Sequence, residues 1–261
     1  LTMPHFIDEL FDLFNENPRD HFNYKKKDIS CKYFWDDGTK LSAYSDKIKF
    51  TKEIENILGV KQSIVSAYLL KAKKKYELTK RMFLEQSLHK LKTYFTKDLL
   101  NGVFNIFSFQ INKTLNQVNA SELKEPHLVQ LFNRFATYNG SSPYKTPGMM
   151  TLVQHLEQEY GTFVSDKGMQ NITNSLYNLA LRQGVDFKFN NYVSEILVSN
   201  KIATGIKVGD KTYESDIVIS NMDVVPTYRN LLKNHYQPEK ILNQERSSSA
   251  LIFYWGVKKE F

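Results

Sequence analysis

The chain of 261 residues is long enough for one large domain or two modest ones, and its 41% apolar residues suffice for a sizeable core. A formal net charge of +7 favours anionic surfaces or phosphate groups as partners without identifying either. The single cysteine, Cys31, excludes an internal disulfide and fits a reducing compartment, and no apolar run approaches the roughly 18 residues of a membrane-spanning helix.

The first predicted elements are a helix and a hairpin. Residues 4–17, "PHFIDELFDLFNEN", place phenylalanines and leucines among acids in the pattern of an amphipathic helix. Residues 31–44, "CKYFWDDGTKLSAY", are two apolar arms around Asp37-Gly38, which is a hairpin signal because glycine adopts positive φ at low cost. From Asp46 to Phe135 the pattern is helical, with Gly59 as a stop.

A loop and two further helices follow. Residues 138–148, "YNGSSPYKTPG", contain two prolines and an Asn-Gly pair, which forbid a continuous helix. A short helix is expected near 149–161. The next helix begins at Lys167-Gly168-Met169, and Gly184 is expected to end it. Its unpaired N–H groups and positive dipole end favour an anion, although a plain capped helix explains the pattern equally well.

The last third of the chain is predicted to be mainly strands. Residues 185–189 alternate apolar and polar side chains, and residues 192–215 are expected to form a hairpin or meander. The continuous apolar run at 217–219 indicates a strand buried on both faces. Residues 225–233 resume a helix, and "SSALIFYWGVKK" at 248–259 is expected to be a final strand. The fold class is therefore mixed α/β, helix-rich in its first half.

Several segments, taken in their order and spacing, resemble the phytoene-desaturase-like carotenoid flavoenzymes, which are relatives of the amine oxidases. They are "LTMP", "TYNGSSPYKTP", "HLEQEYGTFVSDKGM", "GVDFKFNNYVSEILV", "ATGIKV" and "SDIVISNMDVVPTYRNLL". Within that family, "FWDDGTKLSAY" and "ATYNGSSPYKTP" are more similar to the hydroxycarotenoid 3,4-desaturase branch. The similarity covers nearly the whole chain, and the helical middle is its weakest part.

The chain departs from the family in two places. The Pro-x-Gly-Gly-Met usual before the central helix is Ser165-Asp166-Lys167-Gly168-Met169 here, so the geometry of this turn is open. The Gly-x-Gly-x-x-Gly fingerprint of the pyrophosphate site is absent from residues 1–261. In the family that motif precedes a "LTMP"-like segment and a second flavin motif follows later. The chain is therefore expected to be an interior fragment that lacks both ends of the cofactor site and, expressed alone, is colourless.

The resemblance implies FAD as cofactor and a two-domain oxidoreductase with an incomplete Rossmann-like FAD domain and a helix-rich substrate domain. Residues 1–20 and 161–235 would belong to the FAD domain, 21–160 to a substrate and membrane-facing domain, and 236–261 would return to the substrate-domain sheet. The implied cofactor-binding residues are Thr2, Met3, Gly168, Met169, Val193, Ser220, Asn221 and Met222.

Each of these residues also has an ordinary structural interpretation. Thr2 and Met3 could simply lead into the first helix, Val193 could be a strand core residue, and Asn221 could cap the following helix. Tyr138 and Tyr144 are expected in the wall of the substrate cavity, where a flat ring and a hydroxyl would suit a hydroxylated polyene; a surface connection is the alternative.

The implied reaction is FAD-dependent desaturation of a carotenoid, with hydride passing to the flavin because no side chain accepts one. No catalytic base is predicted: the six histidines are scattered without metal-ligand spacing, and Glu157 and Glu159 are expected to face different ways. The alternatives are a polyene isomerase or saturase, an amine oxidase, or a non-enzymatic lipid-binding module.

The basic stretch at 69–83 could lie on an anionic bilayer, or it could be a solvated helix face. It has no recognisable pattern of nucleic-acid binding, and nucleic acid is not expected as a partner. With the resemblance, it suggests a cytoplasmic enzyme peripheral to the inner face of the membrane. The substrate's identity, the electron acceptor and the oligomeric state are not predicted.

Overall fold

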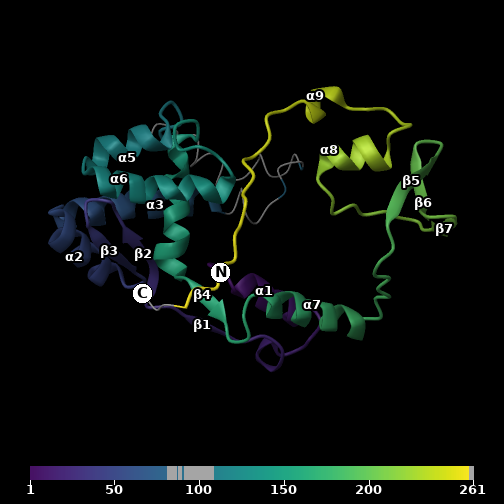
Figure 1. The fold of residues 1–261 in the computed structure, drawn as a ribbon, viewed down its shortest axis with the longest axis horizontal. Coiled ribbons are helices and arrows are strands. Elements are labelled where there is room, and N and C mark those ends of the chain that lie inside the picture. Colours follow the sequence, from purple (N-terminus) through teal and green to yellow (C-terminus); the bar gives the residue numbers. More distant parts are fainter. Residues whose placement is uncertain (81–86, 88–89, 91–108, 259–261) are drawn as a thin grey trace. The chain divides into compact units, whose positions relative to one another are not determined.

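The computed structural model describes residues 1–80, 87, 90 and 109–258 (Figure 1). The chain divides into two compact units. The first comprises Leu1–Leu179 with Ser247–Phe261, and the second comprises Ala180–Arg246. The predicted mixed α/β class is confirmed, whereas the division into an FAD domain and a substrate domain stays a prediction.

The chain begins with the predicted amphipathic helix, α1 (His5–Asp12). A short turn of helix, η1 (Pro18–Asp20), leads to β1 (Tyr24–Lys26), which pairs antiparallel with the distant β4 (Phe163–Ser165). Phe11 of α1 packs with Phe22 and Leu179 in a small core of its own. The apolar side of α1 therefore packs on this small core. Just before α1, Leu1 exchanges backbone hydrogen bonds with Phe163 of β4.

The predicted hairpin and the helix after it are both confirmed. Strands β2 (Ile29–Phe34) and β3 (Lys40–Tyr44) pair antiparallel around Gly38, whose φ of +87° requires the glycine. The hairpin packs on α2 (Lys47–Leu58). Asp46 caps α2 by accepting from the Lys49 amide at 2.8 Å, and Gly59 ends it at φ +68°.

Three further helices enclose the main core of the first unit: α3 (Gln62–Lys80), α5 (Leu115–Leu123) and α6 (Pro126–Asn133). Their buried side chains meet those of α2 and the hairpin in one cluster that includes Phe50, Ile54, Val65, Leu128 and Phe132. Each such side chain contributes roughly 1.5–3 kcal/mol when buried. Most of the predicted helical block between 81 and 108 lies outside the described residues.

The segment from Arg134 to Tyr160 is more irregular than predicted. It forms 3₁₀ turns η5 (Arg134–Asn139) and η6 (Gly148–Val153), then a π-helical turn η7 (Leu156–Tyr160), instead of one short α-helix near 149–161. Gly148 explains part of this path, because a Cβ there would lie 2.6 Å from Val118 Cγ2. The backbone at Gly148 therefore passes close to α5, and a residue with a side chain would not fit at this first position of η6.

The helix expected after Lys167-Gly168 is α7 (Gln170–Arg182), followed by Gly184 at φ +85°. The strand predicted over residues 185–189 is wrong. Val185, Phe187 and Phe189 are all partly or largely exposed, and the two phenylalanine rings stack on each other at 5.8 Å. Alternating apolar and polar residues give a segment one apolar face, but a strand also needs a second strand to hydrogen-bond with its backbone. No described strand pairs with residues 185–189.

The second unit contains the predicted meander. Strands β5 (Val193–Ser199), β6 (Ile202–Val208) and β7 (Lys211–Glu214) pair antiparallel in that order. Asn200 and Lys201 both have positive φ, as a tight hairpin turn between β5 and β6 requires. The helices of this unit are short: α8 (Val224–Pro226), the π-helical turn η8 (Thr227–Leu231) and α9 (Glu239–Leu242).

Two predicted strands are wrong. Residues 216–219 are not a buried strand: Ile217 is 76% and Ile219 is 89% exposed. Residues 248–258 are extended without strand pairing, and their apolar side chains are exposed, so the expected return to a sheet at 236–261 is not seen in the described part. A buried strand needs hydrogen-bonded neighbours and covered faces, and an apolar run alone supplies neither.

Candidate functional site

A pocket of about 420 Å³ in the second unit collects four of the predicted cofactor-binding residues. One wall comes from the sheet: Ile196, Ile206 and Tyr213 face one another across β5, β6 and β7. The other wall is the extended segment 215–222. Val193 lies three residues before Ile196, and the register shift between Val193 and Glu195 lets both line the same pocket. Ser220, Asn221 and Met222 complete the lining.

A small hydrogen-bond network fixes the turn that carries these last three residues. The Ser220 hydroxyl lies 2.9 Å from that of Thr227 and accepts from the Met222 amide at 3.3 Å. Asp223, rather than Asn221, caps the following helix, because its carboxylate accepts from the Val225 amide at 2.8 Å. The capping role considered for Asn221 is therefore wrong.

No charged side chain lines this pocket, and its walls are mainly apolar. Its polar groups are the Ser215 and Ser220 hydroxyls, the Asn221 amide and the Tyr213 phenol, together with backbone groups of the extended segment. This chemistry suits a flat, mostly apolar ring system with a few hydrogen-bonding positions. Across the described ranges there is no group of three or more His, Cys, Asp or Glu side chains that could hold a metal.

The other four predicted cofactor-binding residues belong to the first unit. Thr2 and Met3 follow Leu1, whose backbone pairs with Phe163 of β4. Gly168 has φ +79° and Met169 is 51% exposed, immediately before α7. The N–H groups of Asn171 and Ile172 already donate to the Gly168 and Met169 carbonyls, each at 3.1 Å. Those two donors are therefore not free for an anion.

Of the two predicted substrate-binding residues, Tyr138 lines an apolar cavity. This cavity has about 350 Å³ and almost entirely apolar walls from α3, η5, η6 and η7, including Tyr76, Met149, Met150 and Leu156. Tyr144 is 67% exposed and is not part of this lining.

A partly buried polar network behind Tyr138 was not predicted from the sequence. The Tyr138 hydroxyl donates to Glu157, which also accepts from the Arg134 guanidinium at 2.8 Å. Arg134 in turn donates to the Tyr33 hydroxyl at 2.8 Å. Burial raises the pKa of Tyr138, and the hydrogen bond to Glu157 raises it further, so this hydroxyl stays protonated and acts as a donor.

The contacts of Glu157 and Glu159 confirm that they face different ways. Glu157 binds Arg134 and Tyr138, whereas Glu159 binds Lys47 and Lys73. Nothing in the sequence around 156–160 identifies Arg134 as the partner of Glu157.

The family described as "Flavin containing amine oxidoreductase" matches residues 6–250. The chain belongs to this family. The predicted relationship to carotenoid flavoenzymes is confirmed as well: the chain is 50% identical over 260 residues to the 1-hydroxycarotenoid 3,4-desaturase of Flavobacterium sp. (strain P99-3). It is also 27% identical over 269 residues to the 4,4'-diaponeurosporene oxygenase of Staphylococcus aureus (strain MRSA252).

Each comparison with these two proteins covers 100% of the chain and 53% of the relative, so the chain spans about half the length of the curated relatives it matches. Among solved structures, an oxidoreductase from Methanosarcina mazei is 18% identical with a TM-score of 0.44, over 62% of this chain and 38% of that one. That likeness is too distant to carry an argument. None of the helices in the described ranges combines the length and the apolar character that spanning a bilayer requires.

Proposed function

We propose that the protein carrying this chain is an FAD-dependent carotenoid desaturase. The 50% identity to a 1-hydroxycarotenoid 3,4-desaturase over the whole chain carries this proposal. Desaturation removes two hydrogens from adjacent carbons of a polyene, and FAD, when bound, supplies the hydride acceptor that side chains lack. The protein's task is to place the substrate carbons, exclude water and enclose a long apolar molecule.

The pocket of the second unit fits one end of such a cofactor. Its uncharged, mostly apolar walls at Val193, Ile206 and Leu231 would hold a flat ring, and Ser220 and Asn221 would hydrogen-bond to its edge. Met222 would close the pocket, and a strand backbone contact at Val193 remains part of the proposal. Thr2, Met3, Gly168 and Met169 stay proposed flavin neighbours on the family resemblance alone.

The cavity at Tyr138 is the proposed position for part of the carotenoid. Apolar side chains of α3 and η6 would line the polyene, and the Tyr138 hydroxyl is held by Glu157 at one wall. A hydroxylated end group would meet a polar edge there rather than a wholly apolar surface. Tyr144 remains a proposed contact whose ring is exposed in this structure.

A carotenoid is dissolved in lipid, so we also propose that the enzyme works at a membrane surface, on the cytoplasmic side of the inner membrane. The first unit offers exposed apolar side chains beside lysines on α2 and α3, as an interfacial protein requires. This contact is peripheral in the proposal, with the carotenoid passing from lipid into the protein.

The experiment is to give the natural-length protein, reconstituted with FAD, a detergent-dispersed hydroxylated carotenoid. A red-shifted absorbance spectrum and a product mass lower by two hydrogens would support desaturation. An unchanged conjugation length with altered geometry would indicate an isomerase, a blue shift a saturase, and an added oxygen an oxygenase. Conversion of an amine, or lipid binding with no flavin-dependent chemistry, would overturn the proposal in favour of the other two alternatives.

A further inference from the structure

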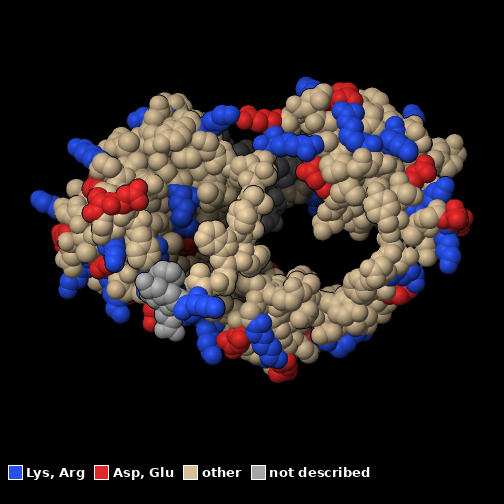
Figure 2. All heavy atoms as spheres, in the orientation of Figure 1, with Lys and Arg blue, Asp and Glu red and all other residues tan. Residues whose placement is uncertain are grey.

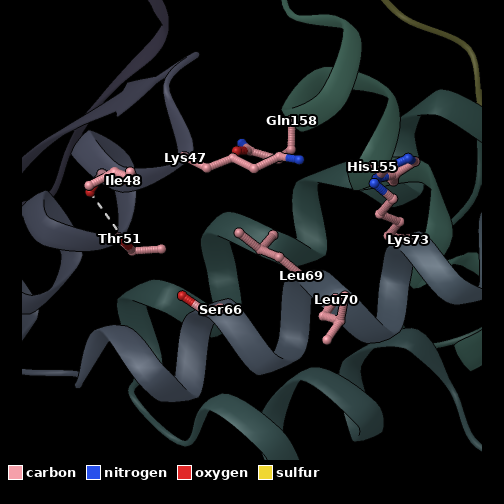
Figure 3. A pocket seen from close by; sticks show the side chains of 9 residues that line it. All are labelled: Lys47, Ile48, Thr51, Ser66, Leu69, Leu70, Lys73, His155 and Gln158. Carbon is pink, nitrogen blue, oxygen red and sulfur yellow. Dashed lines mark hydrogen bonds between the residues drawn. The ribbon is translucent and has the colours of Figure 1, made fainter.

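A second pocket of the first unit lies between α2, α3 and the 155–158 segment (Figure 3). It has about 260 Å³, several times the volume of a water molecule. Lys47 of α2, Lys73 of α3, His155 and Gln158 supply polar groups to its lining, and Figure 3 shows the Lys47 side chain near Gln158 and that of Lys73 near His155. The floor is Leu69 of α3.

The charges of this pocket leave room for an anion. Lys47 and Lys73 share one carboxylate, that of Glu159, which contacts Lys47 closely and lies 3.8 Å from Lys73. Two ammonium groups thus share the Glu159 carboxylate, while the nearby Glu77 pairs with Lys80, and both lysine side chains are nearly half exposed. Burial lowers the pKa of His155, so its imidazole is neutral at pH 7 and adds no further charge.

One polar atom of a residue that lines the pocket lacks a hydrogen bond. Gln158 is only 5% exposed, and its Oε1 makes no hydrogen bond in the structure. A buried, unpaired amide oxygen costs roughly the desolvation of that group.

The rim of the pocket is apolar and exposed. Ile48 and Leu70 both line it, yet they are 75% and 67% exposed. Residues 47–80 contain nine lysines and three glutamates, so α2, α3 and their connection hold nearly all of the chain's net charge of +7. Basic side chains on the visible face stand among uncharged surface rather than in one block (Figure 2).

We propose that this pocket binds the phosphate of an anionic phospholipid at a bilayer surface, with Ile48 and Leu70 entering the boundary of the acyl layer. A soluble anion would make no use of the exposed apolar rim, whereas a lipid headgroup brings phosphate and hydrocarbon together. The inference deepens the proposed membrane contact and rests on it. It assigns that contact to one pocket rather than to the general positive charge of α3.

The test measures partition of the natural-length protein onto phosphatidylcholine vesicles with and without phosphatidylglycerol, by co-sedimentation. Lys47→Gln and Lys73→Gln are each expected to lower the partition coefficient on anionic vesicles about five-fold. Glu159→Gln is expected to raise it, because it releases both lysines from their shared carboxylate. Thermal melting checks that each variant is folded, and Ile48→Ser independently tests the apolar rim with an expected loss of binding.

Lys74→Gln is the matched control, since this exposed residue follows Lys73 on α3 but does not line the pocket. An equal loss for Lys74→Gln would overturn the proposal in favour of unspecific attraction. Equal binding to pure phosphatidylcholine, no gain for Glu159→Gln, or full competition by millimolar inorganic phosphate would also overturn it. Turnover of detergent-dispersed carotenoid is measured in parallel, so loss of the lipid site is distinguished from failure of the proposed reaction.

Discussion

At the scale of single residues, Lys75 is a buried ammonium with neutral hydrogen-bond partners. It is 4% exposed, and its Nζ donates to Gln110 Oε1 at 2.7 Å and to Thr151 Oγ1 at 2.8 Å. Burial lowers the pKa of Lys75 from its ordinary 10.5 to about 8. Between these values the unfolded chain binds more protons than the folded one, so the free energy of unfolding rises with pH across this window.

Lys75→Met should remove this rise, which amounts to at most about 3.4 kcal/mol between the two pKa values. Urea unfolding at a series of pH values through the window measures it. The adjacent Lys74→Met is the control, because Lys74 is exposed and should leave the slope as in the unmodified protein. Parallel pH profiles for Lys75→Met and the unmodified protein would contradict the assignment.

The two glutamates of η7 should differ in their contribution to stability. The Glu157 side chain is 8% exposed and holds both Arg134 and Tyr138, whereas that of Glu159 is 37% exposed. Glu157→Gln should lower the free energy of unfolding by about 1–3 kcal/mol, since it weakens a charge-assisted network around a carboxylate that is itself largely buried. Glu159→Gln should cost less than about 1 kcal/mol. Chemical denaturation of both variants measures the difference, and equal losses would refute it.

At the scale of elements, His127 ties the tip of the hairpin to the start of α6. Its Nδ1 lies 2.9 Å from Glu125 Oε1 and its Nε2 lies 3.0 Å from Asp37 Oδ2. The hydrogen bond to Glu125 raises the pKa of His127, and the charge of Asp37 raises it further. Because the pKa of His127 is higher in the folded state, its protonated form stabilises the folded protein. This contribution is complete below the ordinary pKa of 6.5 and is lost as the pH rises through the pKa of the folded state.

We therefore expect His127→Gln to lower the melting temperature at acidic pH and to have a much smaller effect at about pH 8.5. Melting curves at the two pH values measure this. In a His127→Gln and Asp37→Asn double-mutant cycle, the interaction between the two sites should likewise be present at acidic pH and fade at alkaline pH. An interaction independent of pH would show that the imidazolium is not responsible.

Elements that begin or end at a capping residue, a glycine with positive φ or an Asp-Gly turn could be predicted from the sequence. Asp46 and Gly59 bound α2, Gly184 follows α7, and Asp37-Gly38 turns the first hairpin. The failures at 185–189, 216–219 and 248–258 share one cause. Alternation or an apolar run describes the faces of a segment, but a strand exists through a backbone partner that the segment itself does not encode.

At the scale of the whole molecule, the site was predictable only in part, and through resemblance more than through residue chemistry. Val193 and the residues at 220–222 converge on one pocket, although 27 positions separate Val193 from Ser220. The ion pair of Arg134 with Glu157 was not predictable, because the two residues share no sequence motif or helical spacing that would indicate a contact. The lipid pocket likewise depends on α2, α3 and the 155–158 segment meeting in space.

If the second unit holds the flavin and the Tyr138 cavity holds the polyene, substitutions in the two should have separable effects on the natural-length enzyme. Ile219 is 89% exposed and lines the pocket, so Ile219→Glu should fold normally yet lower the flavin bound per protein about ten-fold, a cost of about 1.4 kcal/mol. Ile202→Glu is the matched control, because Ile202 is also exposed and begins β6 of the same unit but does not line that pocket. Tyr138→Phe should raise KM for a hydroxylated carotenoid with flavin content unchanged. Flavin absorbance and steady-state kinetics measure both effects, and a loss of flavin in Tyr138→Phe, or none in Ile219→Glu, would refute this assignment of roles.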